Sequence, residues 1–280
     1  MSPDRVAQCA QLAMLIELSS SPKPGNVDRC HDFSDIEFYH FLQSAVSSYP
    51  IFRKAALGQE GVGFLILEGV RAWQGWHIRS NTHFGSLVLM IPLAVASAGA
   101  GSLQDNLGRV LENTTTQDAL DFYCAFKIAG ARVAEVEEFS LQDPELMERL
   151  QKSGKTLLDL MRLSQGHDLV AREWAHGYER SFRLSERLVE LITQYGPNDG
   201  VVRAYLEALA QVPDSLVSAK FGEEKARHIS IRAQEALRDT TLSAAALLDE
   251  ELVAEDINPG STADLIAASL FICLLRGLRF

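Results

Sequence analysis

Residues 19–35, SSSPKPGNVDRCHDFSD, separate two strongly helical segments and carry far more chemistry than a connection needs. Pro22 and Pro24 forbid a continuing helix, and each restricts the backbone of the residue before it. Gly25 permits a positive φ. Three aspartates, one lysine and one arginine lie in the same run. The stretch therefore predicts a stiff, charged loop around which the flanking helices are arranged.

Helical periodicity continues on both sides of this loop. Ser2-Pro3-Asp4 has the residue types of a helix start, and the pattern predicts a first helix that ends near Leu18. S-D-I-E at 34–37 predicts a capping box for a second helix, which Pro50 would end. Further helices are predicted over 61–77, 84–98, 103–112, 117–130 (capped by Thr116), 144–150, 155–163, 167–195 (with Gly177 as a weak point), 201–210, 223–238, 243–254 and 262–276.

No segment shows the alternation of β-branched residues that is typical of strands. No repeat of fixed period and no low-complexity linker interrupts the chain. The sequence therefore predicts an all-α fold, with residues 1–280 as a single multi-helix globular domain that has a central buried helix pair.

Composition and charge exclude several classes of protein. The 280 residues are 47% hydrophobic and 22% charged, which is ordinary for a globular chain, and the net charge of -11 argues against a nucleic-acid partner. The N-terminus lacks the features of a signal peptide, and SLVLMIPLAVASAGAG at 86–101, the longer of the two longest apolar runs, has about 16 residues and is too short to span a membrane. Four cysteines without paired spacing predict reduced thiols in a cytoplasmic protein.

Three polar clusters interrupt the apolar helices, and each lies in a turn directly before a predicted helix. They are residues 22–35, residues 79–83, and the pair 213–220 with 258–264. Helix N-termini present unpaired N–H groups and a positive dipole end, so such turns are natural anion sites. Lys23 and Lys220 would add charge-assisted contacts to phosphates.

Several carboxylates in these turns have the chemistry that Mg²⁺ requires, because this ion takes one or two carboxylates and completes its shell with water and phosphate oxygens. The candidates are Asp28, Asp32, Asp35 and Asp264. Lysine, aspartate and helix N-termini together indicate a magnesium–triphosphate ligand.

Each cluster also has a purely structural interpretation. Asn81-Thr82 is an adequate N-cap, and Ser261 with Asp264 forms a capping box. Residues 22–25 can act as a helix terminator only, and Glu17 can reach a backbone N–H of the loop. Histidines on apolar helices are more often hydrogen-bonded structural groups than catalysts. This default applies to His31, His40, His77, His83, His167, His176 and His228.

Taken together, these residues resemble the triphosphoribosyl-dephospho-CoA synthase family, over the whole chain. The motifs are Glu17, PKPG at 22–25, VDR at 27–29, FLQSA at 41–45, NTH-x-G at 81–85, PDSL at 213–216 leading to KFG at 220–222, and NPGSTADL at 258–265. Any one of these motifs is weak evidence, whereas their common order is specific for the family.

The resemblance implies an all-helical transferase with ATP as substrate. In the implied reaction, the 2′-hydroxyl of dephospho-CoA attacks C1 of the ATP ribose, adenine leaves, and the transition state resembles an oxocarbenium ion. Nucleotide and CoA-like molecules are therefore the expected partners. Mapped onto this chain as a hypothesis, the reaction gives Lys23, Arg29 and Lys220 as phosphate clamps and Asp28, Asp32 and Asp264 as Mg²⁺ ligands. Glu17 or Asp35 would be the base or the carboxylate that faces the cationic ribose, and Asn81 and His83 would contact ribose or adenine. Further binding residues are Pro24, Gly25, Thr82, Asp214, Ser215, Gly260 and Ser261.

The chain departs from the citrate-lyase branch of this family at several positions. Leucine is typical where Asn26 stands, and lysine where Phe84 stands. A Gly-Ala-His-x-Asp-Met run is typical where residues 30–35 lie, and a Thr-His-Gly-Glu run has only residues 175–178 as an approximate counterpart. The chain therefore resembles a divergent branch of the kind found in archaea and methylotrophic bacteria, and its acceptor is open.

Two other functions remain open on the sequence alone. One is a paralogous enzyme of one-carbon (tetrahydromethanopterin-type) cofactor synthesis, and the other is a nucleotide-binding protein that has lost catalysis. Trp73, Trp76 and the apolar C-terminal helix fit a core or a dimer face equally well, so a homodimer also stays open.

Overall fold

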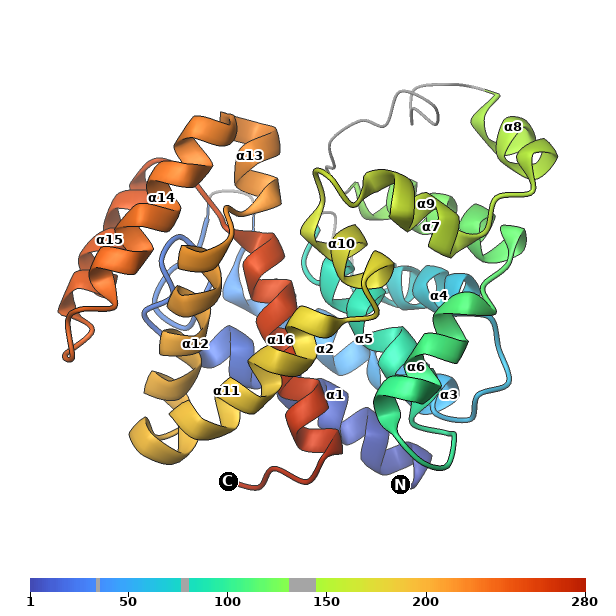
Figure 1. Ribbon diagram of the computed structural model, residues 1–280, viewed down its shortest axis with the longest axis horizontal. Coiled ribbons are helices and arrows are strands. Elements are labelled where there is room, and N and C mark those ends of the chain that lie inside the picture. The colour runs from blue at the N-terminus through green and yellow to red at the C-terminus, as the bar shows by residue number, and fades with distance from the viewer. Residues whose placement is uncertain (34–35, 77–80, 131–144) are drawn as a thin grey trace. The chain divides into compact units, whose positions relative to one another are not determined.

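The computed structural model describes residues 1–33, 36–76, 81–130 and 145–280 (Figure 1). Within these ranges it contains sixteen α-helices and no strand, which confirms the all-α prediction. The chain forms two compact units, one of residues 1–11 with 43–179 and one of residues 12–42 with 180–280. Helices α1 (Pro3–Ser19) and α2 (Phe38–Ser47) contribute residues to both units. A single domain over residues 1–280 stays a prediction.

The first unit is built around α5, whose residues are buried on nearly every side. Helix α5 packs on α3, α4, α6 and α10, and α4 packs closely on α7, where Gly63 leaves no room for a Cβ atom against the Asp118 backbone. The helices of this unit beyond α1 and α2 are α3 (Tyr49–Ala55), α4 (Val62–Gln74), α5 (Phe84–Ala96), α6 (Leu103–Glu112), α7 (Thr116–Ala129), α8 (Leu146–Ser153), α9 (Leu157–Ser164) and α10 (Leu169–Ala175).

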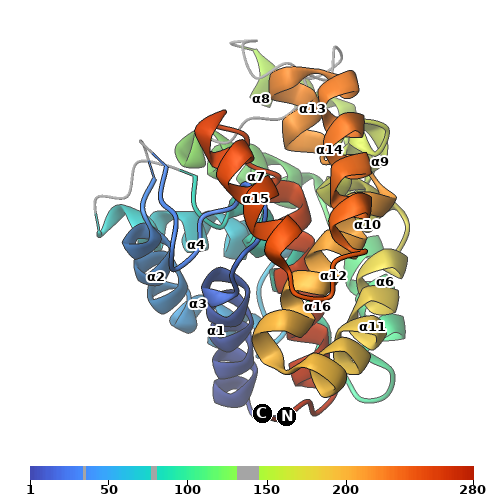
Figure 2. The ribbon, with the colours of Figure 1, turned by 90° about the vertical axis from the view of Figure 1, so that its left-hand side faces the viewer.

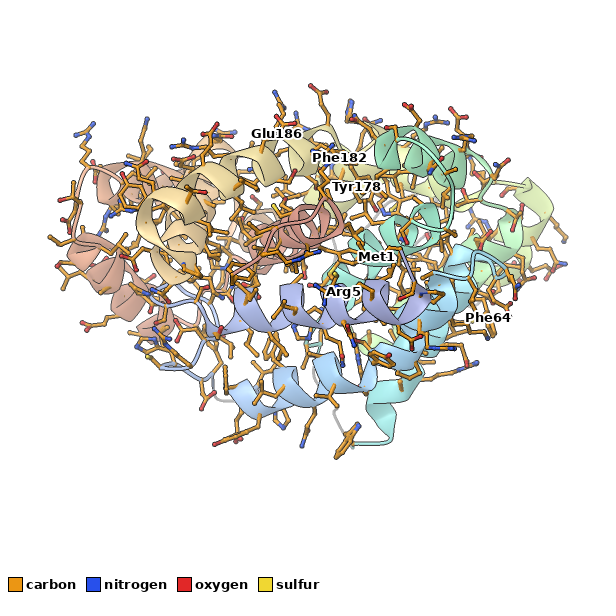
Figure 3. All side chains as sticks on the ribbon, turned by 90° about the horizontal axis from the view of Figure 1, so that it is seen from below. Met1, Arg5, Phe64, Tyr178, Phe182 and Glu186 are labelled. Carbon is orange, nitrogen blue, oxygen red and sulfur yellow. The ribbon has the colours of Figure 1, made fainter. Side chains whose placement is uncertain are left out.

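The second unit contains the last six helices. They are α11 (Glu179–Tyr195, of which Glu179 belongs to the first unit), α12 (Pro197–Gln211), α13 (Ser215–Phe221), α14 (Glu223–Ala236), α15 (Ser243–Ala254) and α16 (Gly260–Leu275). Helix α14 packs against α12, α13 and α15, and α16 packs against α12 and α13 (Figures 1 and 2). Phe182 and Glu186, one turn apart on α11 (Figure 3), both lie against the Arg276 guanidinium.

The loop between α1 and α2 is anchored within the second unit. Val27 and Phe33 join a buried apolar cluster with Leu18, Ile36 and Phe41. Backbone groups of the loop also bond distant helices of this unit. The Tyr205 hydroxyl donates to the Pro24 carbonyl at 2.9 Å, and the Asn198 side chain bonds both the N–H and the C=O of Ser21. The loop is therefore held by apolar burial and hydrogen bonds along its length.

Gly25 shows why this loop has a specific sequence. Its φ is +72°, and a Cβ atom there would lie 2.3 Å from the Ile257 carbonyl oxygen. Its N–H donates to Asp249 Oδ1 at 2.8 Å. Only glycine combines this backbone conformation with so close an approach.

Several predicted helix boundaries were wrong. The helix predicted over 167–195 is two helices, because Gly177 and Tyr178 both have φ of 61°, a left-handed conformation that ends α10. Pro50 does not end α2, which stops at Ser47, but lies in the first turn of α3. The short helix α13 was not predicted.

Two predicted caps were also wrong. Helix α7 is capped by Thr115 rather than Thr116, with a capping box to Asp118. Helix α16 begins at Gly260, so Ser261 and Asp264 lie inside the helix and do not form its capping box. Ser34 and Asp35 of the capping box predicted for α2 lie outside the described residues. None of the described helices is both long and apolar enough to cross a bilayer.

Candidate functional site

Lys23 is the most deeply buried charged residue of the loop, with no exposed surface. Its Nζ atom donates to Glu17 Oε1 at 2.7 Å, to Asn26 Oδ1 at 3.4 Å and to the Val27 carbonyl at 3.5 Å. These three contacts use all three donors of the ammonium group. Burial raises the pKa of Glu17, and the positive charge of Lys23 opposes that rise.

Asn26 links this ion pair to the N-terminal end of α16. Its Oδ1 atom accepts from Lys23, and its Nδ2 atom donates to Asn258 Oδ1 at 3.2 Å. The leucine that is typical of the citrate-lyase branch could make neither bond. The asparagine at position 26 therefore has a structural role in this chain, because it connects Lys23 to Asn258 by hydrogen bonds.

Asp28, His31 and Asp249 form a second cluster, from the loop and from α15. His31 Nδ1 lies 3.0 Å from Asp249 Oδ2 and 3.5 Å from Asp28 Oδ1. Both carboxylates are buried, whereas the His31 side chain is 31% exposed. One potential ligand atom from each residue lies within 4.8 Å of the other two. This is the one group of three such side chains that could hold a metal ion among the residues that the structure describes.

Each carboxylate of this cluster has one oxygen fixed by the backbone. Asp28 Oδ1 accepts from the N–H groups of Cys30 at 2.7 Å and His31 at 3.1 Å, and Asp249 Oδ1 accepts from Gly25. The other oxygen of each carboxylate is buried without a hydrogen-bond partner in the described part of the chain. Burial raises the pKa of Asp249 to about 6, an effect that the Gly25 hydrogen bond and His31 reduce.

Asp214 joins the N-terminal ends of α13 and α16. Its Oδ1 atom accepts from the N–H groups of Leu216 and Val217, and its Oδ2 atom accepts from the N–H and the hydroxyl of Thr262. Burial raises the pKa of Asp214, and the Thr262 contacts oppose that rise. Ser215 and Ser261 lie beside it with their hydroxyl oxygens 2.8 Å apart. The motifs PDSL and NPGSTADL therefore meet, as the sequence clusters suggested.

Other predicted residues of this unit lie at its surface or in existing contacts. Arg29 is exposed and donates to Asn198 Oδ1 at 3.2 Å. Lys220 pairs with Asp256 Oδ2 at 2.6 Å. Asp32 is exposed and accepts from the Phe38 N–H at 2.5 Å, while Asp264 is half-buried on α16. Asp32 and Asp264 are not members of the Asp28–His31–Asp249 cluster.

The predicted residues of the first unit lie at the start of α5. Asn81 Oδ1 accepts from the Phe84 N–H at 3.2 Å, which agrees with its interpretation as a cap. His83 is buried, and its Nδ1 atom lies 2.5 Å from Ser44 Oγ in a hydrogen bond. The Thr82 hydroxyl is buried without a hydrogen-bond partner among the described residues.

Phe84, which stands where lysine is typical, contributes to an aromatic cluster and leaves no cation at this position. Its ring centroid lies 5.7 Å from Phe122 and 5.5 Å from Phe126. The run at 175–178 forms the turn between α10 and α11, with the Tyr178 side chain fully buried.

Sequence reasoning missed Asp249 and treated His31 as structural. Asp249 occurs in the ordinary helical run LLDEELVA, and no local motif distinguishes it from the acids beside it. Its contact with Gly25 spans 224 positions in the chain, which no spacing argument detects. The sequence did contain a sign that His31 belongs to a polar cluster, because it follows Asp28 by three residues in the same loop. Asp35, the alternative base, lies outside the described residues.

The fold and these polar clusters define a class of protein: an all-helical protein with buried acids, a buried lysine and two helix N-termini joined by Asp214. The family model described as ATP:dephospho-CoA triphosphoribosyl transferase matches residues 3–279. The chain therefore belongs to the ATP:dephospho-CoA triphosphoribosyl transferase family, a family of transferases, which confirms the resemblance seen in the sequence.

Similar proteins support this assignment over nearly the full chain. A "Probable 2-(5''-triphosphoribosyl)-3'-dephosphocoenzyme-A synthase" of Streptococcus equi subsp. zooepidemicus is 25% identical, with 98% of this chain and 97% of the relative covered. A protein of the same name from Pseudomonas fluorescens is also 25% identical, with 96% and 91% covered. The crystal structure of a candidate triphosphoribosyl-dephospho-coA synthase from Archaeoglobus fulgidus is 28% identical, has a TM-score of 0.72, and covers 85% of this chain and 100% of its own.

Proposed function

We propose that this protein transfers the triphosphoribosyl group of ATP to dephospho-CoA or a related acceptor and releases adenine. The observation that carries this proposal is the family match over residues 3–279, because it includes every motif around the polar clusters. The reaction breaks the bond from ribose C1 to adenine and forms a bond from C1 to the acceptor oxygen. The acceptor proton passes to a base, and adenine takes up a proton as it leaves.

A triphosphate substrate is expected to carry Mg²⁺, so the described acids must be tested for fit. Asp28 and Asp249 each present a buried oxygen without a hydrogen-bond partner, and one or two carboxylates are what Mg²⁺ takes from a protein. Asp32 is already bonded to the Phe38 N–H. We therefore favour Asp28 with Asp249, rather than with Asp32 or Asp264, as the residues that would hold the cation. There it would supply charge neutralisation for the phosphates.

The positive charge that develops on ribose needs a carboxylate whose position is fixed before the reaction. Asp28 and Asp249 are assigned to the cation in this proposal, so this role falls to another acid. Glu17 fits the role of base less well than the sequence suggested, because Lys23 holds its carboxylate in an ion pair. Lys23 itself would contact a phosphate only by exchanging one of its present partners.

In the first unit, His83 is the candidate for contact with adenine or ribose. Ser44 hydrogen-bonds the Nδ1 side of the ring, which orients the imidazole. This assignment predicts that Ser44→Ala lowers kcat more than it changes KM for ATP, because ring orientation would be lost without loss of a binding group.

The proposal is tested by incubating the protein with ATP, with and without dephospho-CoA, and separating the products by chromatography. Adenine that appears only with dephospho-CoA supports the proposal, and the product gains the mass of a triphosphoribosyl group. Asp28→Asn should abolish the product, whereas Asp32→Asn is the matched control at an exposed aspartate of the same loop. ATP binding without adenine under any acceptor would instead indicate a non-catalytic protein, and adenine without any acceptor would indicate a glycohydrolase.

A second candidate function is the same transfer to a different acceptor, such as one in one-carbon cofactor synthesis. Two residues that differ from the citrate-lyase pattern favour it. Asn26 makes a hydrogen bond to Asn258, and Phe84 packs against Phe126, so both differences are part of the folded structure. Adenine release with a pterin or sugar-phosphate acceptor, and none with dephospho-CoA, would select this function.

A further inference from the structure

The cluster of Asp28, His31 and Asp249 contains a nitrogen donor as well as two carboxylates. We propose that these three residues form a resident site for a first-row transition-metal dication, with Mn²⁺ as the probe ion, and that His31 makes the site prefer such an ion to Mg²⁺. The inference deepens the proposed cation site, but its test uses no ATP and no transferase activity.

Three unpaired buried atoms are the primary observation. Asp28 Oδ2, Asp249 Oδ2 and His31 Nδ1 are all buried, and none has a hydrogen-bond partner within the described ranges. The side chains of Asp28 and Asp249 are fully buried. Buried polar atoms are almost always hydrogen-bonded, and a buried charge without a partner is costly. Three such atoms in one cluster are explained together by an ion that binds all three residues.

The separations within the cluster fit an ion of this size. Ligand atoms about 2.1 Å from a metal in tetrahedral geometry lie about 3.4 Å apart, and in octahedral geometry about 3.0 Å apart. His31 Nδ1 lies 3.0 Å from the unpaired Asp249 Oδ2 and 3.5 Å from Asp28 Oδ1, the backbone-bonded oxygen of the carboxylate whose Oδ2 is unpaired. One potential ligand atom of each residue lies within 4.8 Å of the other two. Small adjustments of the side chains would therefore place all three donors on one ion.

The surroundings hold these donors as the outer shell of a metal site does. Backbone N–H groups of Gly25, Cys30 and His31 fix the second oxygen of each carboxylate. Such contacts orient ligands and restrict their motion in known metal sites. The partial exposure of His31, at 31%, leaves one side of the cluster open to water or to an additional ligand.

A protonated His31 between two carboxylates is the alternative without a metal. It would make an ion pair, and the 3.0 Å distance to Asp249 is compatible with one. The geometry nevertheless gives no hydrogen bond at His31 Nδ1, although an imidazolium N–H that close to a carboxylate would be expected to make one. This alternative also leaves one negative charge of the two acids without compensation.

The imidazole decides which ion the site prefers. Mg²⁺ binds oxygen ligands and retains much of its water, whereas imidazole suits the first-row transition metals. His31 therefore should contribute strongly to the affinity for Mn²⁺ and weakly to the affinity for Mg²⁺.

The test is a Mn²⁺ titration of the full chain, freed of metal with a chelator and monitored by the loss of the electron paramagnetic resonance signal of free Mn²⁺. Competition with Mg²⁺ gives the second affinity. We expect saturable binding of one Mn²⁺ per chain. His31→Ala should weaken Mn²⁺ at least about ten-fold and Mg²⁺ by no more than about two-fold. Asp249→Asn, which keeps an oxygen for the Gly25 N–H, should weaken both ions.

His228→Ala is the matched control, because His228 is an exposed histidine outside the cluster and should leave both affinities unchanged. Circular dichroism spectra confirm that each variant is folded. The inference is overturned if the native chain binds no Mn²⁺ at millimolar concentrations, or if His31→Ala binds Mn²⁺ as the native chain does. Mn²⁺ binding that depends on His31, without adenine release from ATP, would retain the metal site and reject the proposed function.

Discussion

Two clusters of buried charge lie in the same unit, and they differ in how completely their atoms are paired. In the Lys23–Glu17 pair, each of the three ammonium donors has an acceptor. In the Asp28–His31–Asp249 cluster, three polar atoms have no hydrogen-bond partner among the residues that the structure describes. Both clusters take residues from the same loop. The difference in hydrogen bonding therefore depends on the side chains that each cluster contains and not on the loop backbone alone.

This difference separates a structural use of buried charge from a functional one. A buried ion pair with satisfied donors tolerates no loss of either partner, because the remaining charge would be left in an apolar environment. A cluster with unpaired atoms already carries that cost, so a ligand that completes it is stabilising.

The largest effect is expected from Lys23→Met, which leaves the buried Glu17 without its partner. We expect the free energy of unfolding to fall by about 3–5 kcal/mol in urea titrations. The double variant Lys23→Met with Glu17→Gln should recover most of that loss. Lys220→Met, which breaks an exposed pair with Asp256, should cost less than about 1 kcal/mol. Equal losses at Lys23 and Lys220 would contradict the comparison.

Asp214→Ala should have the next largest effect, because Asp214 is another buried acid whose oxygens are fully paired. The change removes the acceptor of the Leu216 and Val217 N–H groups in α13 and of the Thr262 N–H and hydroxyl in α16. We expect the free energy of unfolding to fall by about 2–3 kcal/mol. Asp214→Asn keeps one acceptor oxygen and should cost about half as much. Thermal unfolding monitored by circular dichroism measures both variants, and a loss below about 0.5 kcal/mol for the alanine variant would be the contrary result.

A smaller effect of opposite sign is expected from Asp249→Asn in buffer without divalent ions. The amide keeps an oxygen for Gly25 and removes a buried negative charge beside Asp28, so the chain should become more stable by about 1 kcal/mol. Mn²⁺ should then no longer raise the melting temperature, as it should in the native chain. A variant less stable than the native chain would show that Asp249 is already paired and not open to a ligand.

The smallest effect concerns Asp239, an exposed acid whose two carboxylate oxygens both accept hydrogen bonds. Hydrogen bonds from the N–H groups of Ala244 and Thr241 hold its pKa at about 2, below its ordinary value. Because the folded pKa is lower than the unfolded one, the stability it contributes is complete above about pH 4 and is lost as the pH falls toward 2. A titration of its carboxyl carbon by NMR gives the pKa directly, and a midpoint near pH 4 would contradict the expectation.

The sequence predicted the all-α class and most helices because apolar periodicity and capping residues act locally. Helices α6 and α15 have the predicted bounds. Gly177 was a predicted weak point of one long helix, but the end of the helix there was not predicted, since positive φ at the buried Tyr178 depends on tertiary packing. Likewise, Pro50 starts α3 rather than ending α2, because proline suits both positions.

The polar site could be predicted only in part. Motifs located Lys23, Asp28 and Asp214 in turns before helices, and the structure places them in buried polar contacts. Sequence patterns could not show that Lys23 is held by Glu17 and Asn26, nor that Asp214 caps α16 in place of Ser261. Asp249 was missed because its role depends on a contact with the other end of the chain.

The bond between Gly25 and Asp249 joins residues 224 positions apart, and this separation has a consequence for protein synthesis. The second unit combines residues 12–42 with residues 180–280, so the early loop has no helix α15 to bind until almost the whole chain has emerged from the ribosome. At the ordinary rate of translation this delay is on the order of ten seconds or more. During that time the acidic loop is without the contacts that bury it, whereas residues 43–179 of the first unit follow one another continuously and can begin to fold.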